Sequence, residues 1–221
     1  MATSGTTTFD LSIEEIIAES FERCGLSVRS GYDLKTSRRS LNLLFAEWAN
    51  RGLNLWTIEQ RTKTLVAGTT SYDLDADLVD ILSAVLFTAS DTTVDKQVER
   101  LSRAEYLHLS KKTTQATSTQ YYLERSITPK LYLYPTPDAA DTFKYYALTR
   151  IQDAGSYSNN AEIPFRFLPC LVAGLAYYIA MKKAPDRIQL LKQVYEDEWT
   201  RASQEDSTRS SLRIVPNVGS M

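Results

Sequence analysis

The N-terminal part of the chain carries apolar residues at helical spacing. One face of a first helix collects five of them: Ile13, Ile16, Ile17, Phe21 and Cys24. Ser12 followed by Glu15 fits a capping box at its start, and Gly25 is a natural stop. A second helix is predicted from near Asp33 to Gly52, with an apolar stripe made of Leu41, Leu44, Phe45 and Trp48. Because both helices are amphipathic, each needs a partner surface.

The pattern changes at Trp56. From there to about Ile151 the chain is rich in Thr, Val, Ile and Tyr and short on helical periodicity. The sequence predicts five strands, bounded by turn residues such as Gly68 and Pro129: Ile58–Val66, Leu82–Thr88, Gln120–Arg125, Lys130–Tyr134 and Thr142–Ile151. A short helix is predicted around Ser102–Leu109. A β block of this length is enough for a small sandwich or barrel.

Helical periodicity returns in the C-terminal part. Pro164 precedes Phe165–Lys183, an almost wholly apolar helix that should be buried on most sides. Pro185 stands where a helix N1 proline would stand. The helix that follows should run to about Asp206, with a stripe made of Ile188, Leu191, Tyr195, Trp199 and Ala202. Residues 207–221 lack sustained periodicity and are interpreted as an extended tail.

The order of these elements predicts an α+β fold. Residues 10–55 and 160–206 would form one discontinuous helical bundle, and residues 56–152 an antiparallel β domain inserted into it. Residues 207–221 would form the C-terminal tail.

Composition narrows the functional classes. The 221 residues are 43% apolar and 24% charged with a net charge of −2, which is typical of a globular protein. One histidine, two cysteines and eight glycines leave little for zinc sites, catalytic triads, disulfide frameworks or phosphate loops. The nearly equal numbers of basic and acidic residues, 25 and 27, argue against a DNA-coating protein, which would carry a basic excess. No targeting segment is visible, and the apolar run Phe167–Met181 is shorter than a membrane span. We therefore expect a soluble, intracellular, non-enzymatic protein.

Individual candidates for chemistry are weak. His108 lacks a neighbouring nucleophile pattern and is expected to be a structural or surface histidine. Cys24 and Cys170 are expected to pack. Four acidic residues resemble a calcium loop at first sight: Asp73, Asp75, Asp77 and Asp80. The glycine and glutamate that such a loop requires are replaced by Leu78 and Ala84, so solvated turn carboxylates are the preferred interpretation. We expect no metal site and no cofactor.

Tyrosines are the most distinctive residues of the β block. Nine of the thirteen lie between Tyr72 and Tyr157. The pairs Tyr121-Tyr122 and Tyr145-Tyr146 each place one ring on either face of a strand. Basic residues that could form a nucleic-acid groove are sparse there: Arg125, Lys130, Lys144 and Arg150. Core packing together with a protein interface is therefore favoured over a nucleic-acid surface.

Three segments together resemble a known family. Leu43–Gly68 is LLFAEWANRGLNLWTIEQRTKTLVAG, Tyr121–Asp138 is YYLERSITPKLYLYPTPD, and Tyr195–Asp206 is YEDEWTRASQED. In this order they resemble the head-to-tail adaptor (connector) proteins of short-tailed bacteriophages, of the tail tubular protein A kind. The resemblance spans roughly residues 10 to 215, and the joint order of the segments carries it.

The resemblance implies a structural protein of the virion and no enzyme. Such adaptors form twelve-membered rings at the head–tail interface, beneath the portal protein, after assembly in the host cytoplasm. They extend the channel through which genomic DNA passes without sequence-specific binding, and they dock the tail nozzle protein. Their fold is a helical bundle with an inserted β domain, and no membrane is involved. The family's tail reaches onto the portal, which here implies a portal-binding segment made of Arg209, Leu212, Arg213, Ile214, Val215 and Pro216.

Two alternatives stay open at this stage. One is another virion protein, such as a tail-completion factor. The other is a carbohydrate-binding or cell-wall-hydrolysing tail module that uses the tyrosine-rich block as its sugar platform. The second predicts that replacing Tyr132 or Tyr145 with alanine abolishes sugar affinity.

Overall fold

The structure is a computed structural model that describes residue 5 and residues 11–52, 55–88 and 91–205. The chain divides after residues 53 and 152 into two compact units. We call residues 1–53 with 153–221 the helical unit, and residues 54–152 the β unit. N-terminal helices pack with C-terminal helices and two β-sheets are inserted between them in the sequence, so the predicted α+β fold is confirmed. The predicted domain limits, as limits of parts that fold independently, stay a prediction.

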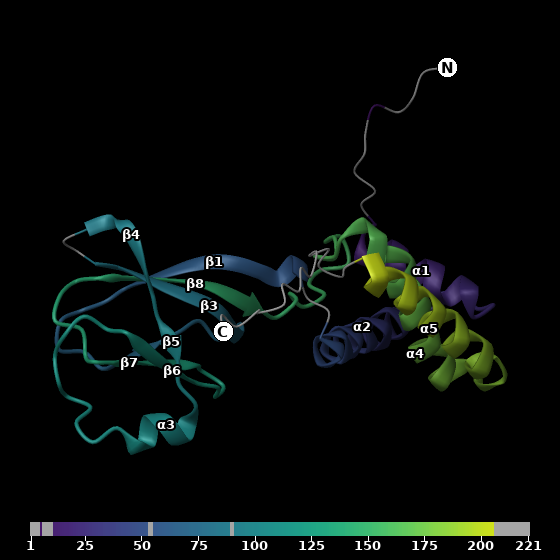
Figure 1. Ribbon diagram of the computed structural model, residues 1–221. Helices are drawn as coiled ribbons and strands as arrows, with labels where there is room; N and C mark the ends of the chain where they lie inside the picture. The colour runs from purple at the N-terminus through teal and green to yellow at the C-terminus, as the bar shows by residue number, and fades with distance from the viewer. Residues whose placement is uncertain (1–4, 6–10, 53–54, 89–90, 206–221) are drawn as a thin grey trace, which may run out of the picture. The chain divides into compact units, whose positions relative to one another are not determined.

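Four long helices make up the helical unit (Figure 1): α1 (Ile13–Arg23), α2 (Gly31–Arg51), α4 (Leu168–Lys183) and α5 (Ile188–Glu205). Short 3₁₀ turns, η2 (Phe165–Phe167) and η3 (Pro185–Arg187), precede α4 and α5. The predicted capping box is present, because the Ser12 side chain accepts from the Glu15 N–H while Glu15 accepts from the Ser12 N–H at 2.8 Å. It satisfies N–H groups that a helix start leaves without partners.

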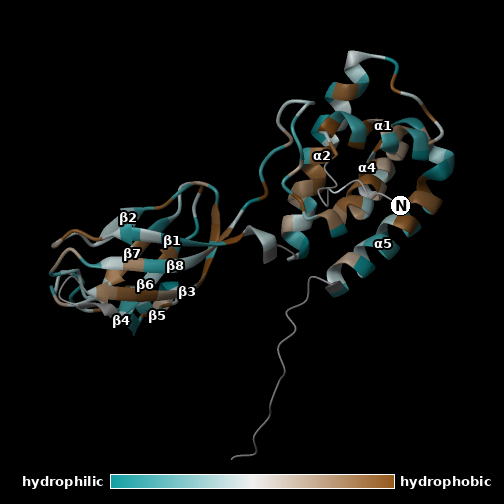
Figure 2. Ribbon diagram, turned by 90° about the horizontal axis from the view of Figure 1, so that it is seen from above, coloured by the Kyte–Doolittle hydropathy of each residue, from teal (hydrophilic) through white to brown (hydrophobic). Residues whose placement is uncertain are grey.

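Helix α4 is the centre of the helical unit. It is hydrophobic along most of its length (Figure 2), and α1, α2 and α5 all pack on it. The Ser20 hydroxyl of α1 donates to the Val172 carbonyl at 3.2 Å, so these two backbones lie close together. By length and composition Phe165–Lys183 could cross a membrane, but 61% of it is buried inside the protein. Burial by neighbouring helices accounts for its apolar character, as predicted.

The segment that leads from the last strand into α4 is bound to the helices. The N–H groups of Ile13 and Glu14 donate to the carbonyls of Asn159 and Tyr157 at 2.9 and 3.0 Å. The Asn42 amide oxygen of α2 accepts from the Ala154 N–H at 2.9 Å. The first two bonds supply partners for the start of α1 that its own cap does not provide, and the third joins the segment to α2.

The β unit contains two four-stranded sheets (Figure 1). The first has the order β1 (Ile58–Thr64), β8 (Thr142–Thr149), β3 (Leu78–Thr88), β4 (Asp91–Gln97), and all its pairs are antiparallel. The second has the order β2 (Ser71–Asp73), β7 (Lys130–Tyr134), β6 (Gln120–Glu124), β5 (Glu99–Arg100). Its β5–β6 pair is parallel and the others are antiparallel. Helix α3 (Arg103–His108) contacts β6.

The core of the β unit lies between its two sheets. Alternate residues of β6, β7 and β8 point inward, which is the pattern of a half-buried strand. Together with buried residues of β2, β3 and the connecting segments they form one cluster of buried side chains: Leu65, Tyr72, Leu74, Leu78, Ile81, Ala84, Leu86, Val98, Tyr121, Leu123, Leu131, Leu133, Phe143, Tyr145 and Ala147. The ring of Tyr121 from one sheet meets the edge of Phe143 from the other, with centroids 5.5 Å apart. The unit is a small sandwich.

Several predicted boundaries were wrong for identifiable reasons. Strand β3 begins at Leu78, not Leu82, because two register shifts against β8 break its period-two alternation. The pattern missed β4 because all its residues except Val94 are polar, and β2 and β5 because they have only three and two residues. The first three residues of the predicted Phe165 helix form a 3₁₀ turn. The end of the last helix predicted at Asp206 lies outside the described residues.

Candidate interaction surfaces

The predicted portal-binding residues lie outside the part of the chain that the structure describes. These are Arg209, Leu212, Arg213, Ile214, Val215 and Pro216. The structure places only the helix that leads to them, and α5 reaches Glu205. The role of these six residues stays a prediction.

A cluster of polar groups joins three helices against the aromatic core of the helical unit. Arg51 of α2 donates two hydrogen bonds of 2.9 Å to the two carboxylate oxygens of Glu196 on α5, and it also pairs with Glu47 at 2.6 Å. Its guanidinium lies over the rings of Tyr195 and Trp199, 5.1 and 4.7 Å from their centroids. Bidentate pairing and ring stacking both suit the planar guanidinium.

Glu47 is the acceptor that this cluster shares. The Tyr178 hydroxyl donates to it at 2.8 Å and the Tyr195 hydroxyl at 3.2 Å, while the Trp48 indole N–H donates to the Tyr195 hydroxyl at 2.9 Å. Burial, with the hydrogen bond to Glu47, raises the pKa of Tyr178 to about 12, and burial raises the pKa of Tyr195 further. The hydrogen bonds from Arg51 lower the pKa of Glu196. The cluster holds fixed charges and neutral phenols, which suits a rigid support for packing.

The tyrosine pairs of the β unit point to opposite faces, as predicted. Tyr145 is 3% exposed between the sheets, whereas Tyr146 is 48% exposed on the outer face of the first sheet. On the second sheet, Tyr122 stacks on Tyr132 at 5.8 Å and on Tyr106 of α3 at 5.2 Å. One member of each pair therefore belongs to the core.

The two tyrosines named for a sugar platform are not open platforms. Tyr145 faces the core, and the ring of Tyr132 is tilted against Tyr106, 5.3 Å between centroids. The Tyr132 hydroxyl donates to Glu124 at 3.0 Å. Neither ring offers a free face of the kind that stacks on a sugar, so no observation favours the carbohydrate alternative.

Ion pairs hold the acidic residues that resembled a calcium loop. Arg61 donates to both carboxylate oxygens of Asp77, at 2.9 and 2.6 Å, and to Asp75 at 3.0 Å. Asp80 pairs with Arg100 at 2.8 Å and with Arg125. Lys130 lies 3.6 Å from Asp73. The predicted turn carboxylates are therefore paired rather than merely solvated, and the described residues contain no cluster suited to a metal ion.

The two cysteines lie at packing positions, and the histidine lies on the surface. Cys24 and Cys170 are buried free thiols, and burial raises the pKa of Cys170 to about 12. A thiol held in this protonated form is a poor nucleophile. His108 is the last residue of the exposed helix α3, which has no buried residue.

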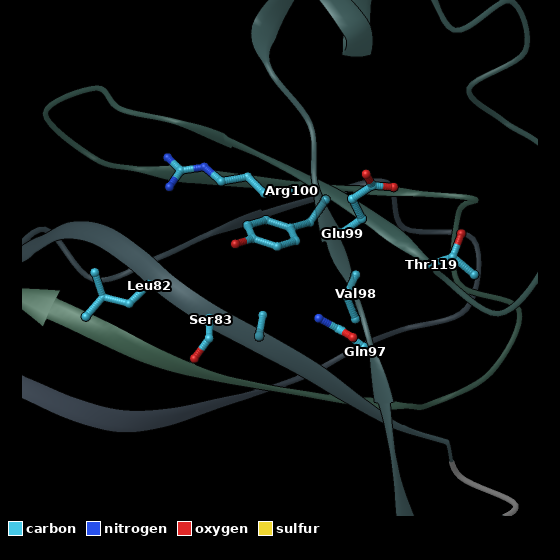
Figure 3. Close-up of a pocket in the computed structure, with 9 residues that line it drawn as sticks. Leu82, Ser83, Gln97, Val98, Glu99, Arg100 and Thr119 are labelled. Carbon is cyan, nitrogen blue, oxygen red and sulfur yellow. The ribbon is translucent and has the colours of Figure 1, made fainter. Parts of the chain in front are cut away.

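A hollow opens at the side of the sandwich, where the chain passes from the first sheet to the second (Figure 3). Ser83 of β3 and Gln97, Glu99 and Arg100 from the crossing lie around it. Arg100 is held by Asp80 and by the Ile81 carbonyl at 3.2 Å, and Glu99 accepts from the Gln120 amide at 3.3 Å. These paired polar groups include no nucleophile with an adjacent base, so the hollow offers no catalytic arrangement.

Comparison with known families decides the class of the protein. Residues 13–217 match the family described as SU10 adaptor protein, which covers both units and most of the segment after α5. The chain belongs to the SU10 adaptor protein family. No curated protein matches the chain.

Membership of the SU10 adaptor protein family confirms the resemblance to phage head-to-tail adaptors that the three sequence segments carried. It makes the chain a phage adaptor protein and a structural component of the virion, and it implies a non-enzymatic role and binding to other virion components. The helical unit agrees with such a role, because the polar groups around Glu47 bond to one another and hold helices together.

Sequence reasoning missed the polar cluster of the helical unit. The sequence patterns assign no role to Glu47 or Arg51, and Glu196 stands among the alternating charges of an ordinary solvated helix face. A signal was available in the position of Arg51, three residues after the core residue Trp48 and hence on the same side of α2. Its partner Glu196 is far away in sequence, so only the fold identifies the pair.

Proposed function

We propose that this SU10 family adaptor forms a closed ring of twelve copies under the phage portal, extends the DNA channel and docks the tail nozzle. The observation that carries the proposal is the family match, which runs through both units without a break from residue 13 to residue 217. It is supported by the architecture, since a helical unit with an inserted β unit is the arrangement that head-to-tail adaptors are expected to have.

Exposed apolar and aromatic groups support assembly into a ring. A subunit of a closed ring meets each neighbour through a heterologous interface, which requires two different complementary patches. The outer face of the first sheet offers Tyr146 beside Val85 and Lys144. The exposed side of α2 offers Tyr32 beside Lys35 and Arg39. Tyrosine and arginine are enriched at protein interfaces, so both patches suit contacts between subunits.

The charge of the chain supports a passive DNA channel. A protein that grips DNA neutralises phosphates with many lysines and arginines. The net charge of −2 does not supply such an excess. Genomic DNA would then slide through the ring without sequence-specific binding during ejection.

The tail provides the contact with the portal in this proposal. Arg209 and Arg213 act as charged anchors, and Leu212, Ile214 and Val215 as apolar anchors before Pro216. The ring would form in the host cytoplasm and stay at the head–tail interface of the virion.

The test is to mix the purified protein with the portal ring of its own phage and weigh the complex by native mass spectrometry. Twelve copies of 25.0 kDa add about 300 kDa for a closed ring. The matched variants are a chain that ends at Arg209 and a full-length chain in which Leu212, Ile214 and Val215 are replaced with alanine. Loss of the added mass with both variants supports the ring and the tail contact together.

Two other outcomes decide between the parts of the proposal. The full mass gain with both variants would keep the ring and discard the tail as the portal anchor. No gain with the unchanged protein at micromolar concentration would reject the portal ring and favour another position in the tail. The nozzle protein should then bind the portal–adaptor complex and not the portal alone.

A further inference from the structure

An apolar groove runs between α1 and the first half of α4 in the helical unit. Its floor consists of Leu11 and Ala18 on the α1 side and Phe165, Leu168, Pro169 and Val172 on the α4 side. Its rim carries Glu15, Glu19 and Glu22 of α1, against the single cation Arg23. We call this surface the α1–α4 groove. Its chemistry suits an apolar segment that carries positive charge.

The α1–α4 groove is uncovered in the described part of the chain. Phe165 is 74% exposed, which is unusual for a phenylalanine that lies beside a core helix. Arg23 forms an ion pair with Glu19, with 3.0 Å between the charged groups. No ion pair among the described residues engages Glu22. The groove therefore offers both an apolar floor and an unneutralised carboxylate to an occupant.

The C-terminal segment of the same chain has the complementary composition. Residues 207–216 read STRSSLRIVP, with two arginines, three branched apolar residues and no acidic residue. The other chain end is a poorer match, because the only charged side chain in residues 1–10 is Asp10, which repeats the sign of the rim. Charge complementarity with the acidic rim therefore favours the C-terminal segment over residues 1–10 as the occupant of the groove.

Helix α5 leads the chain toward the end of the groove at which Phe165 lies. It packs against α4, and Trp199 meets Phe167 at the start of α4 with ring centroids 6.4 Å apart. Helix α5 contacts η2, which contains Phe165, and ends at Glu205, about 9 Å along its axis from Trp199. Extended chain spans about 3.3 Å per residue, so residues 206–212 can reach about 20 Å. That exceeds the diameter of one helix, about 10–12 Å.

We propose that the α1–α4 groove binds the C-terminal segment of its own chain. Leu212 and Ile214 lie on the apolar floor, and Arg209 and Arg213 face Glu19 and Glu22. The consequence rests on the proposed function: the residues that would anchor the portal are held on the subunit until the portal displaces them. The groove thus gives the free adaptor a resting place for its docking segment.

Disulfide trapping in the full-length chain tests the contact. One variant carries Ala18→Cys and Ile214→Cys, and its control carries Leu190→Cys, an exposed position on α5 outside the groove, with Ile214→Cys. The native thiols Cys24 and Cys170 are buried and should not compete. We expect an intramolecular cross-link about tenfold faster in the first variant, since a bound segment raises the local thiol concentration.

Two results would overturn the proposal. Equal rates in both variants would mean that the segment does not settle in the groove. Cross-linked dimers in place of monomers would assign the groove to the segment of a second copy. Because the assay uses the isolated protein, its failure leaves the portal ring standing, and failure of the portal experiment leaves this contact standing.

Charge reversal at the rim gives an independent readout. Adding Glu22→Lys to the Ala18→Cys, Ile214→Cys chain should slow the intramolecular cross-link about threefold, because it repels both arginines. The matched control is Asp197→Lys, the same charge change on the exposed side of α5. Equal slowing by both substitutions would mean that net charge, and not the groove, sets the rate, and would overturn the proposed pairing.

Discussion

The helical unit and the β unit place their charged groups differently. In the helical unit, Arg51 pairs with Glu47 and Glu196 and lies over two core rings. The hydroxyls of Tyr178 and Tyr195 also donate to Glu47. In the β unit, Arg61 pairs with Asp75 and Asp77, whose side chains are 73% and 46% exposed, and the cluster between the sheets is apolar and aromatic. The sandwich is one continuous stretch of chain, whereas the bundle joins two distant stretches.

The difference shows what a polar cluster can add to a discontinuous unit. Apolar burial is non-directional, so it holds distant helices together without fixing how they face one another. Hydrogen bonds to a shared carboxylate have direction, and removing one leaves partners unsatisfied. We infer that the cluster around Glu47 fixes the mutual orientation of α2, α4 and α5, and that the sandwich relies on its strand register instead.

The largest expected effect comes from removing the aromatic centre of the bundle. Trp48→Ala deletes a fully buried ring that contacts Phe167 and Trp199, and large core truncations cost about 3–5 kcal/mol. Hydrogen exchange measured by mass spectrometry should show lower protection in the helical unit and unchanged protection in strands of the β unit. Leu43→Ala, at a 56% exposed position of the same helix, should change little. Equal loss in both units would show that they unfold as one.

Alkaline pH should weaken the helical unit next. The folded state holds the Cys170 thiol protonated up to about pH 12, whereas an unfolded thiol ionises near pH 8.5. Stability is therefore complete below about pH 8.5 and falls as the pH rises toward 12, by about 2 kcal/mol at pH 10. Urea unfolding of the helical unit at pH 7 and pH 10 measures the drop.

Cys170→Ala is the control for that pH dependence. It removes the titrating thiol, so most of the decrease between pH 7 and pH 10 should disappear even if the variant is less stable at both. An unchanged decrease would assign the effect to other groups, such as the tyrosines of the bundle.

The two arginines offer a direct comparison of the units. Arg51→Gln should destabilise the helical unit by about 2 kcal/mol, because two glutamates lose their partner and two rings lose their cover. Arg61→Gln should cost the β unit about 1 kcal/mol, since its partners are largely exposed. Urea unfolding of the two variants measures these costs. Similar costs would contradict the contrast between the units.

The smallest effect concerns how closely α4 is packed. A methyl group added at Gly174 would lie 2.9 Å from the Tyr195 ring and 3.0 Å from Leu44. Gly174→Ala should therefore cost about 1 kcal/mol, as overpacking exceeds the gain in helix propensity. Gly31→Ala, with open space around it at the start of α2, should be neutral or slightly stabilising in thermal unfolding. Stabilisation by Gly174→Ala would mean that the helices can separate at this point.

Most elements of the fold were predictable because their signals are local. The capping box at Ser12, the stripes of α1 and α2, and the β7 strand stand where the sequence predicts them. The start of β3 was predicted wrongly because its buried residues Leu78, Ile81 and Ala84 recur at intervals of three. The register shifts against β8 produce this spacing. Only the partner strand reveals that such spacing is a bulged strand and not a helix.

The sequence by itself determined the order of the helical and β blocks, the mixed fold class and the family, because periodicity, capping and the order of the three resembling segments are written along the chain. Tertiary structure alone decided that Arg51 meets Glu196, that Tyr145 is core while Tyr146 is surface, and that α1 and α4 leave a groove. These facts depend on residues far apart in sequence. The distances in space between such residues are set by how the side chains pack, which no local sequence pattern encodes.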